Sequence, residues 1–261
     1  MDPGSLSRTS QAVALTRARM SRPRTPQGDP DAQLRLCAGM PPLRRPRTGI
    51  YARTRFFDDQ VLAAISAGIG QVVICGAGYD DRALRFRSPG VRFFELDHPA
   101  TQADKRRRLR DMGADLRDVV LAPADFRGDD AAAVLAAAGH DAARPTLFLC
   151  EGLLIYLDVA VIARLLAALR SRAAGRSGLA ASVATHPAGQ DSAQVAAAAN
   201  AGRRHGDTEP WLTILPAPDY LRLLAGAGWQ AQSQADPRAG GAAEGRSLLV
   251  VARPGPVRTE P

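Results

Sequence analysis

The segment Gly76-Ala77-Gly78 directly follows a short apolar run, Gln71–Cys75, and could support ligand binding. Because glycine lacks a Cβ atom, the backbone of such a loop can lie very close to a bound molecule. A dinucleotide-binding fingerprint requires a third glycine shortly afterwards, but this chain continues with Tyr79-Asp80-Asp81. The loop therefore favours a ligand that has no pyrophosphate group.

A carboxylate ends the next apolar run. Asp97 follows Val91–Leu96 and lies 19 residues beyond Gly78. At this place in a strand–helix–strand unit, a carboxylate accepts hydrogen bonds from the ribose hydroxyls of a nucleoside. Gly-x-Gly after a strand is a weak signal alone, and acidic strand ends are common. At this spacing, the two together predict a nucleoside-binding site.

Two further apolar runs lead to acidic residues. Asp125 and Phe126 follow the run Asp118–Ala122, and they suit an adenine amino group next to an aromatic wall. The alternative for Asp125 is an N-cap of the following helix. Glu151 follows Pro145–Cys150, and since burial of an unpaired charge is costly, it should be paired or face the crevice. We expect Glu151 to accept a hydrogen bond from an amino group of the nucleoside cofactor bound at this site.

Strand-like and helical segments alternate along most of the chain, which indicates an α/β fold. The expected helices of the core are Phe56–Ile69, Asp81–Phe86, Pro99–Met112, Asp129–Gly139, Val159–Ala173 and Ala217–Ala227. The expected strands are Gln71–Cys75, Val91–Leu96, Asp118–Ala122, Pro145–Cys150, Gly178–Ala184, Trp229–Gln234 and Ser247–Ala252. This pattern predicts a Rossmann-like, doubly wound, mostly parallel seven-stranded sheet with an antiparallel C-terminal edge hairpin. Ligands bind such sheets at the carboxyl ends of the strands.

The domain organisation predicted is one large domain with an N-terminal extension. Residues 1–52 form an arginine-rich, partly helical extension near the active site, with a short helix over Ser7–Met20. Residues 53–261 form the Rossmann-like domain, with a lid-like insertion near 186–215. Within the insertion, we expect the polar stretch Ala188–Asp207 to be mobile without substrate and to close over the substrate when it binds.

The arginines that precede the core form a local excess of positive charge. We expect them to be a solvated face, with attraction of an anionic substrate as the alternative. They are Arg8, Arg17, Arg19, Arg22, Arg24, Arg35, Arg44, Arg45 and Arg47.

Composition excludes several classes of protein. The net charge is +8, but Lys105 is the only lysine and 5% of residues are aromatic, so a nucleic-acid partner is not expected. No apolar run could span a bilayer and no signal peptide is evident, so we expect a cytoplasmic protein. Cys37, Cys75 and Cys150 are widely separated, which predicts no metal site. Cys75 and Cys150 each end an apolar run, which predicts that these two thiols are buried apolar groups.

Several segments resemble the leucine carboxyl methyltransferase family, from about Tyr51 to Ala252. The matching segments are Tyr51–Arg55, Gln71–Arg85, Phe94–Leu109, Glu151–Tyr156 and Thr208–Trp211. Members often have Asn-Arg-Gly before the first of these, where this chain has Arg47–Ile50. The acceptor pocket is therefore not carried over from the family.

The resemblance implies a class I methyltransferase fold that binds S-adenosyl-L-methionine, releases S-adenosyl-L-homocysteine and uses no metal. It implies that Arg53 binds the carboxylate of the methionine moiety, which suits a planar guanidinium. It places the loop Gly76-Ala77-Gly78 against the same moiety and Asp97 at the ribose.

The resemblance also assigns the remaining parts of the pocket. Asp125 and Phe126 would hold the adenine, and Glu151 would lie on the sulfonium side. Tyr156 would lie near the acceptor group.

The expected reaction is O-methylation of a carboxylate on a small natural product or a peptide, with Arg53 and Tyr156 placing the acceptor. The sulfonium methyl group is already activated, so the enzyme must mainly align the acceptor oxygen and exclude water. A carboxylate is ionised at neutral pH and needs no base. A phenol or alcohol acceptor is the alternative, with His186 as the base, although a histidine beside a proline is commonly structural.

A protein substrate also remains open, because the resemblance extends to eukaryotic members of the family that act on a protein C-terminal carboxylate. A protein that binds cofactor without catalysis is disfavoured by the combination of Arg53, Asp97 and Glu151.

Overall fold

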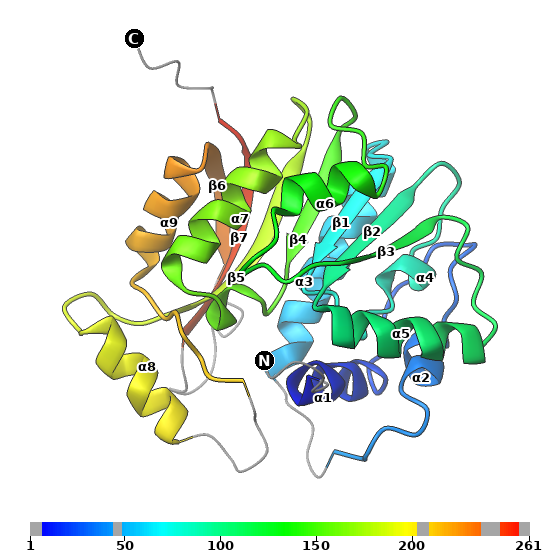
Figure 1. Ribbon diagram of the computed structural model, residues 1–261, viewed down its shortest axis with the longest axis horizontal. Helices are drawn as coiled ribbons and strands as arrows, with labels where there is room; N and C mark the ends of the chain where they lie inside the picture. The colour runs from blue at the N-terminus through cyan, green and yellow to red at the C-terminus, as the bar shows by residue number, and fades with distance from the viewer. Residues whose placement is uncertain (1–6, 44–48, 203–208, 236–245, 256–261) are drawn as a thin grey trace.

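The computed structural model describes residues 7–43, 49–202, 209–235 and 246–255 (Figure 1). The helices in these ranges are α1 (Arg8–Arg17), α2 (Ala32–Leu36), α3 (Gly49–Ser66), α4 (Arg82–Arg85), α5 (Pro99–Asp111), α6 (Ala131–Ala137), η1 (Leu154–Tyr156, a 3-10 turn), α7 (Val159–Ser171), α8 (Ser192–Ala201) and α9 (Ala217–Gly226). The strands are β1 (Gln71–Cys75), β2 (Arg92–Asp97), β3 (Val119–Pro123), β4 (Thr146–Cys150), β5 (Gly178–Thr185), β6 (Trp229–Ala235) and β7 (Arg246–Pro254).

The seven strands form one sheet in the order β3-β2-β1-β4-β5-β7-β6. The strands from β3 to β5 are parallel, and β7 pairs antiparallel with both β5 and β6. The predicted fold class and the antiparallel C-terminal hairpin are therefore confirmed.

Both faces of the sheet are covered. Because successive residues of a strand point to opposite faces, each strand contributes side chains to both cores. Val73, Phe94 and Phe148 belong to the core on the side of α6, α7 and α9. Val72 and Phe93, each one residue away from these in its strand, belong to the core that contains apolar residues of α2 to α5. Figure 1 shows α6 and α7 crossing in front of the sheet, with α1 and α8 below it in this view.

The winding direction of the sheet reverses between β1 and β4. The chain runs from β1 outward to β2 and β3, then returns to the other side of β1 for β4. The register pairs Cys75 with Cys150, so Gly76 and Glu151 follow adjacent strand ends. Ligands bind at such a switch point, and the fold thus places the predicted site residues Gly76 and Glu151 beside it.

The N-terminal part differs from the prediction in two respects. Helix α3 begins at Gly49, earlier than the predicted start at Phe56, so Arg53 lies on a helix. The short helix α2 falls in a region for which the sequence predicts no helix. Helix α1 packs against both α2 and α3.

Cys75 and Cys150 are buried free thiols, as predicted, and Cys37 is a third buried free thiol. Burial raises the pKa of Cys37 to about 11, so its thiol stays protonated at neutral pH. Among the described residues, no helix is both long and apolar enough to cross a membrane.

Candidate active site

The glycine loop after β1 is held in a conformation that suits glycine. Gly76 and Gly78 have φ angles of 67° and 49°, which L-residues with side chains rarely adopt. A Cβ atom on Gly76 would lie 3.0 Å from the side chain of Leu153, and one on Gly78 would lie 2.8 Å from Cβ of Ser10. The loop therefore lies between the turn after β4 and helix α1, and any larger residue would fill that space.

Asp97 ends β2 and reaches back to this loop. Its carboxylate accepts the backbone N–H of Gly78 and, at 2.6 Å, the backbone N–H of His98. Desolvation raises the pKa of Asp97 although these two N–H groups oppose the shift, and the carboxylate of Glu209 raises it further. Carboxylate oxygens have lone pairs for several donors, so Asp97 can accept further bonds from ribose hydroxyls.

Glu151 ends β4 and is surrounded by guanidinium groups. Its Oε2 lies 2.7 Å from Nη2 of Arg17 and 2.7 Å from Nη1 of Arg82, and its Oε1 lies 3.0 Å from Nε of Arg53. The side chain is only 4% exposed. Burial alone would raise the pKa of Glu151, but the arginines outweigh this effect and lower the pKa well below its usual range. Glu151 is therefore ionised and paired, as expected from the cost of an unpaired buried charge.

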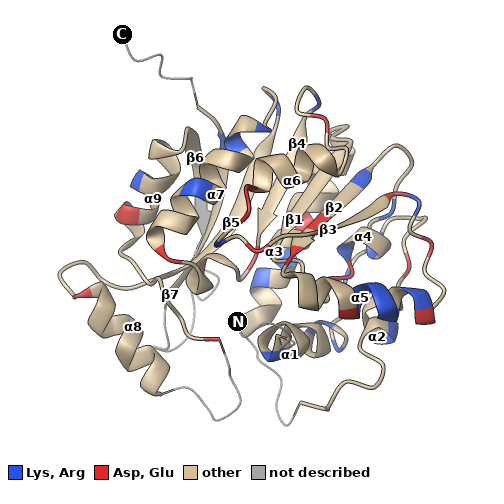
Figure 2. Ribbon diagram, viewed as in Figure 1, with Lys and Arg blue, Asp and Glu red and all other residues tan. Residues whose placement is uncertain are grey.

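Further ion pairs extend from Glu151 into the protein. We call the whole set the buried ion-pair network; its members are Asp58, Asp80, Asp81, Glu151, Arg17, Arg22, Arg53, Arg82 and Arg85. Five arginines and four carboxylates leave one positive charge among these described residues. Figure 2 shows basic residues on α1, α3 and α4, three elements that contribute these arginines.

Two arginines contradict the expectation of a solvated N-terminal face. The side chains of Arg17 and Arg22 are 5% and 0% exposed. Arg22 binds Asp58 through two nitrogens, at 2.8 and 2.9 Å, and binds Asp81 at 2.6 Å. The prediction is wrong at these positions because carboxylates from later in the chain lie beside them; Arg19 is exposed, as expected.

Arg53 is the most exposed arginine of the network, at 22%. Only its Nε is hydrogen-bonded to the described part of the chain, to Glu151. Its terminal nitrogens lie close to Gly152, where a Cβ atom would come within 3.2 Å of Nη2. The Nη groups of Arg53 are therefore available to an anionic ligand at the carboxyl end of β4.

Asp125 and Phe126 follow β3, as predicted. Asp125 is half-buried, and its Oδ1 accepts the backbone N–H of Arg127 at 3.1 Å. It is not the N-cap of α6, because Asp130 has that role and accepts the backbone N–H of Ala132. Phe126 is 8% exposed and belongs to the hydrophobic core, so little of its ring is left to contact an adenine.

The candidate base His186 has both ring nitrogens engaged. Nδ1 lies 2.7 Å from the carbonyl oxygen of Pro187, and Nε2 lies 2.8 Å from the hydroxyl oxygen of Ser192. A neutral imidazole that donates through Nδ1 and accepts through Nε2 satisfies both contacts. His186 thereby joins the end of β5 to the first residue of α8.

Tyr156 lies on the turn η1 after β4 and is half-buried. Its hydroxyl makes no hydrogen bond within the described residues. The backbone carbonyl of the neighbouring residue Ile155 accepts the N–H of Leu212 at 2.7 Å. Asn200 of α8 forms two reciprocal hydrogen bonds of 2.9 Å with the backbone of Trp211. The turn η1, the segment near Trp211 and α8 are therefore linked.

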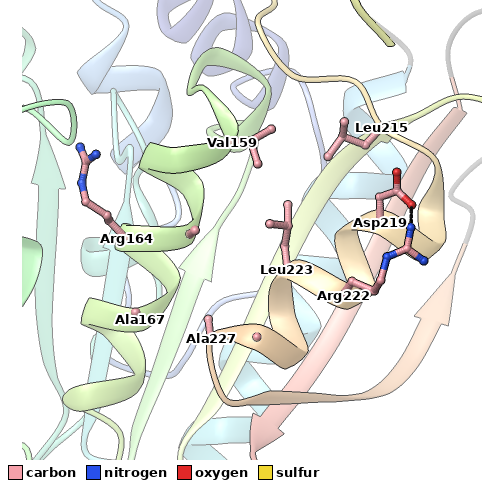
Figure 3. A pocket seen from close by; sticks show the side chains of 10 residues that line it. Val159, Arg164, Ala167, Leu215, Asp219, Arg222, Leu223 and Ala227 are labelled. Carbon is pink, nitrogen blue, oxygen red and sulfur yellow. Dashed lines mark hydrogen bonds and ion pairs between the residues drawn. The ribbon is translucent and has the colours of Figure 1, made fainter. Parts of the chain in front are cut away.

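One hollow lies elsewhere in the described part of the chain. It measures about 770 Å³ and lies between α7 and α9. Figure 3 shows Val159, Leu215 and Leu223 facing it, with Arg222 paired to Asp219 at its edge. None of the predicted site residues lines this hollow, so it is separate from the candidate site.

Sequence reasoning missed Arg17, Arg82 and Asp80 as parts of the site. One signal was present, because the glycine loop is followed by two acidic residues and an arginine, Asp80-Asp81-Arg82. A second signal was Asp58, which lies in the buried stripe of α3 beside Phe57. Charged residues at such positions indicate paired, buried ions.

Comparison with known proteins identifies the family of the chain. A family profile described as leucine carboxyl methyltransferase matches residues 7–170. A relative from Mycolicibacterium gilvum, provisionally named an S-adenosyl-L-methionine-dependent methyltransferase, is 42% identical over 195 residues, covering 72% of this chain and 62% of the relative. One from Frankia alni with the same provisional name is 37% identical over 202 residues, covering 77% and 68%. The chain thus spans about three-fifths of the length of the first of these relatives.

Solved structures share the fold. A provisionally named methyltransferase from Thermobifida fusca superposes with a TM-score of 0.63 at 16% identity and covers 97% of both chains. Magnesium protoporphyrin IX methyltransferase from Synechocystis, solved with bound S-adenosylhomocysteine, gives a TM-score of 0.56 at 13% identity, covering 86% of this chain and 94% of that one. The fold is that of class I methyltransferases.

Proposed function

The chain belongs to the leucine carboxyl methyltransferase family of S-adenosylmethionine-dependent methyltransferases, and from this premise we propose that it methylates a carboxylate on a small natural product or peptide. One observation carries the proposal: the ends of β1 and β2, together with helix α3 held at the end of β4, provide a close glycine backbone, a carboxylate and a guanidinium with free donors. These are Gly76 with Gly78, Asp97, and Arg53.

These groups fit S-adenosylmethionine part by part. The ribose hydroxyls would donate to Asp97, whose carboxylate has acceptor capacity beyond the N–H groups of Gly78 and His98. The methionine carboxylate would bind Arg53, and the single excess positive charge of the buried ion-pair network favours an anion there. The glycine loop would contact the same moiety. A Cβ atom on Gly76 would displace Leu153, and one on Gly78 would displace Ser10.

The acceptor side needs little further chemistry from the protein. S-adenosylmethionine supplies an electrophilic methyl group, and an ionised carboxylate is a sufficient nucleophile without a base. Tyr156, with a hydroxyl that is free within the described residues, would donate a hydrogen bond to the acceptor carboxylate and orient it. The engagement of both His186 nitrogens supports a route that needs no general base.

The test is a methyl-transfer assay with a tritium-labelled methyl donor and a panel of carboxylic acids and short peptides. The same compounds as carboxamides, and a matched panel of phenols and alcohols, serve as controls. Methyl esters release volatile methanol in alkali, whereas methyl ethers do not. We expect volatile label with free carboxylates only; label that stays non-volatile on a phenol or alcohol, or no transfer to any compound, would contradict the proposal.

A further inference from the structure

Arg17, at the end of α1, contacts three separate elements through its guanidinium group. Nη1 lies 2.9 Å from Oδ2 of Asp80 in the loop after β1, and Nη2 lies 2.7 Å from Oε2 of Glu151 after β4. Nε donates to the hydroxyl of Thr54 on α3 at 3.4 Å. With 5% of its side chain exposed, Arg17 is a buried connection between the N-terminal helix and the switch point of the sheet.

Glu151 transmits this contact to Arg53. Its Oε2 is held by Arg17 and Arg82, and its Oε1 accepts from Nε of Arg53. The carboxylate is planar, so fixing one oxygen fixes the direction in which the other is presented. The position of the Arg53 guanidinium therefore depends on the arginines at the opposite end of the carboxylate.

Arg82 cannot hold Glu151 alone. Its Nη1 already serves both Asp80 and Glu151, its Nε binds Asp58, and its Nη2 donates to the carbonyl oxygen of Thr54. Asp80 and Glu151 are close enough for the charge of Glu151 to raise the pKa of Asp80. Without Arg17, Oδ2 of Asp80 and Oε2 of Glu151 would share a single Nη group, the two buried carboxylates would repel each other, and Glu151 would turn away.

We propose that Arg17 is a positioning residue for Arg53, acting through Glu151, and that α1 is thereby part of the cofactor site. The role of Arg53 toward the cofactor carboxylate rests on the proposed function. The arrangement itself rests on the ion pairs of Arg17, Glu151 and Arg53.

The first experiment is a double-mutant cycle on binding of S-adenosylhomocysteine, measured by calorimetry on the full chain. We expect Arg17→Met to weaken binding by about tenfold or more. Arg53→Lys should also weaken it, and the double variant should bind no more weakly than Arg53→Lys alone, since groups acting in one chain are not additive. Arg17→Lys should recover part of the affinity, because an ammonium can still contact both carboxylates. The exposed Arg19→Met is the matched control and should bind as the wild type does.

Two outcomes would overturn the positioning role. Losses from Arg17→Met and Arg53→Lys that add fully would show that Arg17 does not act through Arg53. If folded Arg17→Met had a lowered melting temperature but the affinity of the wild type, Arg17 would be only a structural residue. If Arg17→Met does not fold, the same comparison is made with Arg17→Lys.

A crystal structure of an Arg17 variant separates this inference from the proposed function. We expect Arg53 to leave Oε1 of Glu151 in Arg17→Met, or in Arg17→Lys if only that variant folds, and to keep the contact in Arg19→Met. A retained contact would overturn the positioning role whether or not the protein binds the cofactor. A wild-type protein that ignored S-adenosylhomocysteine, with Arg53 displaced in the variant, would contradict only the proposed function.

Discussion

Asp97 accepts the backbone N–H of Gly78, and this contact joins the end of β2 to the glycine loop after β1. The same carboxylate accepts the N–H of His98 at the start of α5. Asp97 therefore both shapes the loop and presents acceptor oxygens at the carboxyl edge of the sheet. The two roles make it the residue on which the cofactor account depends most.

Replacing Asp97 with Asn should lower affinity for S-adenosylhomocysteine. The amide keeps one neutral acceptor oxygen and replaces the other with an NH2 donor, so the charge-assisted bonds from the ribose hydroxyls would be weakened or lost, and we expect a loss of about tenfold or more. Calorimetric titration at neutral pH measures it. Asp111→Asn, at the exposed end of α5, is the matched control; equal affinities of the two variants would contradict a ribose contact.

Replacing Asp58 with Asn should strongly destabilise the fold. Asp58 is buried and binds Arg22 and Arg82, and removal of one partner from a buried ion pair costs about 3–5 kcal/mol. The neighbouring Asp59 is exposed on α3, so Asp59→Asn should change the free energy of unfolding by less than about 0.5 kcal/mol. Urea unfolding measures both; similar values for the two variants would refute the energetic role of the network.

Replacing His186 with Ala should leave kcat for a carboxylate acceptor unchanged at neutral pH. It should lower stability by about 1–2 kcal/mol, because Ser192 and the carbonyl of Pro187 lose a partner. Ser192→Ala removes one of the same hydrogen bonds and leaves the imidazole in place. If turnover vanished in His186→Ala but persisted in Ser192→Ala, His186 would be a base and the acceptor a hydroxyl group.

Acid should weaken the fold through the buried carboxylates. Burial raises the pKa of Asp80, but Arg82 and Arg17 outweigh it and lower the pKa to about 2 from an ordinary 3.8. Asp80 thus contributes about 2 kcal/mol that is present above pH 4 and lost as the pH falls toward about 2. Glu151, whose pKa is also lowered, acts in the same direction. Unfolding curves between pH 6 and pH 2.5 measure this effect. A free energy of unfolding that stays constant as the pH is lowered from 4 to 2.5 would contradict it.

The sequence predicted the sheet and the glycine loop because their signals are local. The bounds of β1 and the separate apolar runs of β2 to β5 can be read from short segments, and short crossovers then leave few possible strand orders. Glycine is required at positions 76 and 78 because the φ angles there are positive. Asp97 follows from its spacing in the same unit. No distant contact is required for any of these predictions.

The buried ion-pair network could not be read in the same way. Arg17 and Glu151 lie far apart in the sequence. Arg17 alone resembles a surface charge, and the expectation that Glu151 is paired does not identify its partner. The predicted start of helix α3 is too late for a related reason: Arg53 and Thr54, in its first turns, are held by contacts with Glu151, Arg82 and Arg17. These tertiary contacts, which apolar periodicity does not reveal, hold the start of this helix at the site.

Calorimetric titration of the wild-type protein with S-adenosylhomocysteine, alongside a titration with a nicotinamide dinucleotide, tests the central claim most directly. The account predicts saturable binding of one S-adenosylhomocysteine per chain and none of the dinucleotide. Heat of binding from the dinucleotide, or no binding of S-adenosylhomocysteine by folded protein, would contradict it.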